Sequence, residues 1–171
     1  MGPGEDGNDC FAIVYQLFTG DGTIYCDDAW IQRASPDVAI AAAVEMVIRH
    51  QDMEIAAVEA NAGGRYVEKC IRDRLAERSQ IDGREYRFPS VLKNWTSGDN
   101  KLDTADKAGR ISLALWEKLS KGKYHINRHC HSGQILFRQL RGFPTERLDG
   151  PDSAATGDIV LRQLLGERKR K

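Results

Sequence analysis

The sequence has no long hydrophobic run and no excess of charge of either sign. No segment approaches the roughly 18 consecutive apolar residues that a membrane-spanning helix needs. The first nine residues are polar and acidic, which is not the pattern of a secretory signal. Lysine plus arginine and aspartate plus glutamate each number 25, so the overall charge does not indicate nucleic-acid binding. We therefore expect a cytoplasmic protein with no membrane contact, whose DNA contacts, if any, come from local basic patches.

Closely spaced cysteines and nucleotide-binding motifs are absent as well. Cys10, Cys26, Cys70 and Cys130 are widely spaced, which in a reducing compartment predicts free, mostly buried thiols. The chain has no Gly-x-x-x-x-Gly-Lys-[Ser/Thr] motif, and no strand precedes its glycine-rich opening. Neither NTP hydrolysis nor dinucleotide binding is therefore expected.

Length and hydrophobic patterning predict one mixed α/β domain. Of the 171 residues, 41% are hydrophobic, which suffices for a normal core over residues 1–166, with 1–9 as a flexible start and 167–171 as a basic tail. Gly20-Asp-Gly22 predicts a hairpin turn, and Ser35-Pro36 predicts a helix start. The expected strands are 11–18, 23–30, 55–59, 86–88 and 124–127, and the expected helices are 35–50, 66–78, 102–119, 134–141 and 153–165, with 95–100 as loop.

Two acidic groups lie at positions that suit metal binding. Glu59 ends an apolar run, so we expect it at the carboxyl end of a buried strand, where open α/β sheets bind ligands. Asp149 and Asp152 lie around the start of the last predicted helix. Mg²⁺ and Mn²⁺ prefer carboxylate ligands, and two such ions about 4 Å apart can activate water and stabilise a leaving oxygen. The alternatives are a solvated Glu59 and an Asp152 that complements the helix dipole.

A histidine-rich segment, His125, His129, Cys130 and His131, contains residue types that bind zinc. No second ligand pair lies nearby in the sequence, and adjacent strand residues point to opposite faces. We therefore expect partly exposed histidines in a strand-to-helix loop and not a zinc site.

Several short segments share their order and spacing with a known family. They are Asn8-Asp-Cys-Phe-Ala-Ile-Val14, Ala56-Ala-Val-Glu-Ala-Asn-Ala-Gly63, Asn100-Lys101 followed by Arg110-Ile111, Phe137-Arg-Gln-Leu-Arg-Gly-Phe-Pro144 and Leu148-Asp-Gly-Pro-Asp-Ser-Ala154. Together they resemble the C-terminal nuclease domain of phage terminase large subunits across residues 7–165. The resemblance implies an RNase H-like fold, in which helices flank both faces of a mixed sheet.

The resemblance also implies an activity, a site and partners. The activity is Mg²⁺- or Mn²⁺-dependent cleavage of concatemeric double-stranded DNA during phage genome packaging in a bacterial host cell. Glu59 and Asp149 would be catalytic and would ligate two metal ions, with Asp152 as a further ligand. Lys101 and Arg110 would contact DNA phosphates; ordinary surface charge is the alternative for both. The implied partners are a terminase ATPase domain, the small terminase subunit and the portal.

The chain departs from the family pattern in two places. The usual Asp-Asp pair reads Leu148-Asp149, and the first catalytic Asp would fall at or before Met1, where the chain has neither a strand nor an Asp. The ATPase domain that normally precedes the nuclease is also missing. Asp6 and Asp9 are nearby acids, but a glycine-rich stretch would preorganise a ligand poorly.

These departures keep two other functions open. The chain can be a truncated or degenerate terminase nuclease domain that binds DNA or packaging partners without cutting. A more distant alternative is another RNase H-like nuclease, such as a junction resolvase, which would prefer branched DNA.

Overall fold

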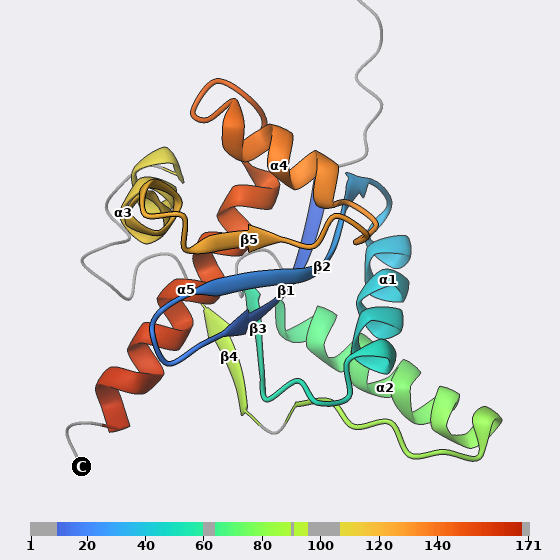
Figure 1. Cartoon of the computed structure of the whole chain (residues 1–171). Coiled ribbons are helices and arrows are strands. Elements are labelled where there is room, and N and C mark those ends of the chain that lie inside the picture. The colour runs from blue at the N-terminus through green and yellow to red at the C-terminus, as the bar shows by residue number, and fades with distance from the viewer. Residues whose placement is uncertain (1–9, 60–63, 90, 96–106, 169–171) are drawn as a thin grey trace, which may run out of the picture.

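The computed structural model describes residues 10–59, 64–89, 91–95 and 107–168 (Figure 1). Its strands are β1 (Cys10–Phe18), β2 (Ile24–Arg33), β3 (Ile55–Glu59), β4 (Val91–Trp95) and β5 (Tyr124–Ile126). Its helices are α1 (Pro36–Arg49), α2 (Gly64–Asp82), α3 (Lys107–Ser120), α4 (Gly133–Arg141) and α5 (Asp149–Arg168). The predicted mixed α/β class is confirmed.

The strands form two sheets. One has the order β1-β2-β5, with β1 antiparallel and β5 parallel to β2, and the other is the parallel pair β3-β4. Ala29 and Ile31 of β2 pack against Leu136 of α4, whereas Asp28 faces the end of α1, so helices cover both faces of the larger sheet. Helix α5 contacts both β1 and β3 and so connects the two sheets.

Local signals in the first part of the chain are confirmed. The β1–β2 turn contains Gly22 at φ 81°, a conformation that glycine adopts without steric cost. Helix α1 begins after Ser35, whose Oγ accepts a hydrogen bond from the Val38 N–H at 3.4 Å. Its buried residues pack on Ile71 and Leu75 of α2, so α1 and α2 lie side by side (Figure 1).

Several predicted elements and boundaries are wrong, and both β2 and α2 end later than predicted, at Arg33 and Asp82 in place of residues 30 and 78. The segment 86–88 is not a strand, because Tyr86 and Phe88 instead pack on the α1–α2 cluster. The strand lies further on, at β4, and includes Trp95, which was expected in a loop. The sequence of β4 shows little strand pattern, because this strand depends on its pairing with β3. Helix α5 begins at Asp149, so this acid lies inside the helix. Helix α3 is described from Lys107, and the predicted helical residues before it lie outside the described part of the chain.

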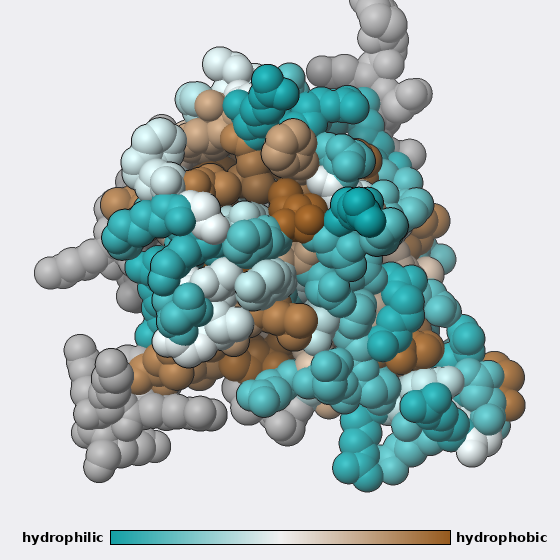
Figure 2. Space-filling model, in the orientation of Figure 1, coloured by the Kyte–Doolittle hydropathy of each residue, from teal (hydrophilic) through white to brown (hydrophobic). Residues whose placement is uncertain are grey.

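The surface and the thiols add two observations. In Figure 2 the face over α1 and α2 is mostly hydrophilic, whereas hydrophobic residues reach the surface around α4, where Phe137 is exposed. All four cysteines are free as predicted, although only Cys26 is fully buried. None of the helices in the described ranges combines the length and the hydropathy that a membrane crossing requires.

Candidate functional site

The first turn of α5 carries two carboxylates, those of Asp149 and Asp152, on one side of the helix. Negative charge in the first helical turn is favourable because it interacts with unpaired N–H groups and the helix dipole. Between them, Gly150 lies so close to β2 and α4 that a Cβ atom would come within 2.6 Å of Ile31 Cδ1 and Gln139 Oε1. The Gly150 N–H donates to the same Gln139 oxygen at 3.0 Å, which fixes the start of α5 against α4.

Helix α3 places two cations against these acids. Lys107 Nζ lies 2.9 Å from Asp149 Oδ1 and 3.7 Å from Asp152 Oδ2, so one ammonium group bridges both carboxylates. Arg110 donates from Nη2 to both oxygens of Asp152, at 2.9 and 3.1 Å. The side chains of Arg110 and Asp152 are only 11% and 16% exposed, so this pair is well shielded from water.

Hydrophobic packing between α3 and α5 holds the four charged groups in place. Ile111 and Leu115 of α3 are buried against Ala154, Ala155 and Ile159 of α5. Full burial of a leucine side chain contributes about 1.5–3 kcal/mol. The charges lie at the beginning of both helices, next to this contact.

Cys10, at the start of β1, borders the same group of side chains. Burial, together with the nearby Asp149 carboxylate, raises the pKa of its thiol, while Arg147 acts in the opposite direction. A thiol with a raised pKa carries less of the nucleophilic thiolate at neutral pH.

The structure brings together only some of the residues predicted for the site. Asp149 and Asp152 are adjacent, and Arg110 lies against Asp152 in place of an open phosphate-binding position. Glu59 ends β3, a strand that α5 contacts, but its side chain lies outside the described part of the chain. Lys101 also lies outside the described residues.

The carboxylates of Asp149 and Asp152 provide only part of a site for a hard cation such as Mg²⁺. Two carboxylates from one helical turn could each give an oxygen to Mg²⁺ or Mn²⁺. Among the side chains that the structure describes, no group of three or more His, Cys, Asp or Glu residues is arranged to hold a metal ion. A complete site therefore requires a further ligand, and Glu59 is the residue that the sequence offers.

The histidines of the 125–131 segment are exposed, as expected for a strand-to-helix loop. His125 stacks on Tyr25 with ring centroids 4.9 Å apart. His129 and His131 flank Cys130, which is half-buried against β2.

Two features were not predicted from the sequence. Lys107 was not predicted. Lys107 and Arg110 on α3 have the same three-residue spacing as Asp149 and Asp152 on α5, and this matching spacing could have indicated that the two helices face each other. A second acidic pair, Asp27 and Asp28 on β2, was also missed, and it borders a cavity.

No protein-family model matches the chain, and a search of curated proteins gave no significant match.

Proposed function

We propose that the chain is a metal-dependent DNA endonuclease of the terminase type, with an RNase H-like fold. The observation that carries this proposal is that Asp149 and Asp152 share the start of α5, a helix that also packs on the strand ending in Glu59. The substrate is double-stranded DNA in concatemeric form, and the partners are the packaging ATPase, small terminase subunit and portal that the sequence resemblance implies.

In this proposal Glu59, Asp149 and Asp152 would hold Mg²⁺ or Mn²⁺, which would supply an activated water molecule and neutralise charge on the scissile phosphate. The protein supplies carboxylate oxygens from separate elements, which is the ligand chemistry that these hard cations prefer.

The two cations of α3 have different roles because their exposures differ. Lys107 is 40% exposed, so its ammonium group could leave Asp149 and contact a DNA phosphate. Arg110 is 11% exposed and contacts both oxygens of Asp152, so it orients this carboxylate. We assign Arg110 a positioning role, and Lys107 joins Lys101 as a candidate phosphate contact.

The strand arrangement supports the finer fold assignment. Within the described residues, β1 pairs only with β2, and β3 pairs only with β4, so each has one edge without a strand partner. Helix α5 contacts both of these strands. This arrangement suits an RNase H-like domain in which a further strand, expected to carry the first catalytic Asp, would lie between the unpaired edges of β1 and β3.

The alternative is a domain that binds DNA without cutting it. It is favoured by the ion pairs themselves, since Lys107 and Arg110 already neutralise the two acids that a metal would need. A catalytically inactive site can keep these acids for their contribution to stability alone.

Supercoiled-plasmid nicking in Mn²⁺ tests the proposal. We expect the native protein to nick the plasmid, and Glu59→Ala, Asp149→Ala and Asp152→Ala to abolish nicking. The matched control is Glu117→Ala, which removes an exposed carboxylate of α3 that pairs with Lys121. Retained plasmid binding by the inactive variants would separate loss of chemistry from loss of folding.

Three other outcomes would count against this reading. Absence of nicking by the native protein at every metal concentration, with DNA binding intact, would support the non-catalytic alternative. Nicking that persists in the Glu59 and Asp149 variants would place the active site elsewhere. Strong preference for branched over linear duplexes would support a junction resolvase.

A further inference from the structure

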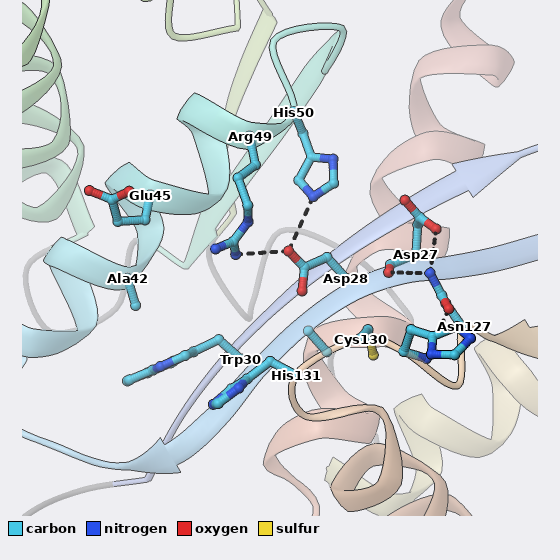
Figure 3. A pocket seen from close by; sticks show the side chains of 12 residues that line it. Asp27, Asp28, Trp30, Ala42, Glu45, Arg49, His50, Asn127, Cys130 and His131 are labelled. Atoms are coloured by element: carbon cyan, nitrogen blue, oxygen red, sulfur yellow. Dashed lines mark hydrogen bonds and ion pairs between the residues drawn. The ribbon is translucent and has the colours of Figure 1, made fainter. Parts of the chain in front are cut away.

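Strand β2 contains a bulge that places two consecutive carboxylates on one rim. Tyr15 is opposite Asp28 and Gln16 is opposite Cys26, so Asp27 is the extra residue without a partner in β1. Successive side chains of a regular strand point to opposite faces, but a bulge re-aims one of them. Asp27 and Asp28 both line the same cavity, which measures about 590 Å³ (Figure 3). A pocket of this size accommodates a small organic group.

Asp28 is nine-tenths buried, and only one of its oxygens is paired. Oδ2 accepts hydrogen bonds from Arg49 Nη2 at 2.8 Å and from His50 Nε2 at 3.1 Å. The other oxygen has no partner among the described residues, and in Figure 3 it points away from Arg49 and His50, toward the side lined by Trp30 and His131. Because this oxygen faces the cavity and accepts from no described side chain, a donor group of a ligand can reach it in place of water.

The charge of the lining favours a cation. Its three carboxylates are those of Asp27, Asp28 and Glu45, and its one formal cation is Arg49 when the histidines are counted as neutral. Asp28 is balanced by Arg49, and Glu45 is balanced by Arg78 at 2.8 Å. Asp27 accepts only from the neutral amide of Asn127, at 3.0 Å, and has no ion pair among the described residues. One negative charge therefore remains in the pocket.

Flat rings form the opposite wall. Trp30 and His131 lie next to each other below Asp28 and present their planes in a similar orientation (Figure 3). A planar cation can stack on tryptophan while its edge donates to carboxylates. Guanidinium combines these properties, because it is planar, weakly hydrated and has five N–H donors in one plane, whereas ammonium is a strongly hydrated point charge.

We propose that this pocket binds a guanidinium group, either the arginine side chain of a partner protein or a small guanidino compound. The group stacks against Trp30 and His131 and donates to the free oxygen of Asp28, while the carboxylate of Asp27, on the other side of Asp28, supplies the unbalanced negative charge (Figure 3). The pocket lies on the α1 side of β2, whereas the Asp149–Asp152 site lies at the start of α5 near α3. The inference therefore does not depend on nuclease activity.

Titration of the full chain with N-acetylarginine amide tests the proposal, with backbone amide chemical shifts as the readout. We expect saturable shifts at the pocket residues and none with N-acetylcitrulline amide, the neutral analogue of the same shape. An acetyl-Gly-Arg-Gly amide peptide distinguishes the two sources. Tighter binding of the peptide than of the free compound indicates a protein partner, and equal binding indicates a small molecule.

Variants test the assigned contacts. Asp27→Asn keeps the size of the side chain and should weaken binding about tenfold, because it removes the unbalanced negative charge of the pocket. His131→Ala changes an exposed residue and should weaken binding about threefold through lost stacking. Glu117→Gln, an exposed change on α3, is the control and should bind like the native protein.

Three results would overturn the proposal. They are equal binding of the citrulline and arginine compounds, unchanged affinity in both pocket variants, and saturation of the same residues by adenosine monophosphate at lower concentration than by the arginine compound. The last result would identify a nucleotide pocket instead.

Discussion

The molecule contains two pairs of neighbouring acids whose surroundings differ. Asp149 and Asp152 share one face of a helix, and Lys107 and Arg110 provide a cation for each. Asp27 and Asp28 are adjacent on a bulged strand, and Arg49 provides a cation only for Asp28. The helical pair is electrostatically complete in the absence of ligand, whereas the strand pair retains one unbalanced charge beside a cavity.

This difference predicts that one acidic pair contributes mainly to the stability of the fold and the other mainly to ligand binding. A fully paired, shielded acid contributes mainly to the stability of the fold, and a metal ion can bind it only by displacing the existing cation. An unpaired acid beside a cavity contributes little to stability and leaves its charge available to a ligand. Substitutions at the two pairs should therefore affect different measurements.

The largest effect on stability is expected from Arg110→Ala. The substitution leaves the shielded Asp152 carboxylate with only the more distant Lys107 ammonium at 3.7 Å. Removing one partner of a buried ion pair costs about 3–5 kcal/mol, and the partial exposure of this pair reduces our expectation to about 2–3 kcal/mol. Urea unfolding measures the change in the free energy of unfolding. The control Lys69→Ala breaks an exposed pair within α2 and should not change it measurably. Equal changes in the free energy of unfolding for the two substitutions would show that shielding from water does not determine how much an ion pair contributes to stability.

Asp28→Asn and Asp27→Asn compare the two acids of the strand pair. Asp28 loses two charge-assisted hydrogen bonds, so Asp28→Asn should lower the free energy of unfolding by about 1.5 kcal/mol, since Arg49 is itself half-exposed. Asp27→Asn keeps its amide contact and should change this free energy by less than about 0.5 kcal/mol. Urea unfolding of both variants measures these two changes in the free energy of unfolding. A larger loss from Asp27→Asn would contradict the distinction drawn between them.

The two acidic pairs also differ in how well the sequence predicts them. The helical spacing of Asp149 and Asp152 follows from the 3.6-residue period, so their common face was predictable even though the helix begins at Asp149 and not at Ser153. The bulge was not predictable, because an extra residue in β2 depends on how β1 aligns with it, and alternation alone assigns Asp27 and Asp28 to opposite faces.

The rest of the fold follows the same division between local and long-range causes. The β1–β2 hairpin and the start of α1 depend on Gly22 and Ser35, whose effects are confined to a few residues. Strand β4 depends on pairing with β3, which is distant in sequence, and its own residues Val91–Trp95 show little alternation. Tyr86 and Phe88 have strand-like side chains but pack on α1 and α2. The facing pairs on α3 and α5 become evident only once the two helices are known to be neighbours.

A smaller effect is expected from Lys107→Ala, and it concerns metal binding. If Asp149 and Asp152 ligate Mn²⁺, Lys107 competes for the same oxygens, since it lies 2.9 Å from one carboxylate and 3.7 Å from the other. Its removal should tighten Mn²⁺ binding about threefold, which corresponds to about 0.65 kcal/mol. Isothermal titration calorimetry measures this affinity, with Lys121→Ala as an exposed control just beyond the opposite end of α3. Weaker Mn²⁺ binding in Lys107→Ala would mean that the lysine supports the site and does not compete for it.

The smallest effect is expected on the pH dependence of stability, from a substitution of Asp158. Like Asp152, Asp158 has two nearby cations, but its side chain is more deeply buried. Its side chain is 3% exposed and lies between Arg162 Nε at 2.7 Å and Lys118 Nζ at 3.6 Å. Desolvation by burial outweighs both cations and raises the pKa of the carboxyl group above 3.8. The folded state therefore retains the proton at pH values where the unfolded chain has released it, and stability decreases as pH rises through this window. Asp158→Asn should remove that part of the slope when the free energy of unfolding is measured against pH from acid upward. An unchanged slope would show that Arg162 and Lys118 compensate fully for the burial of Asp158.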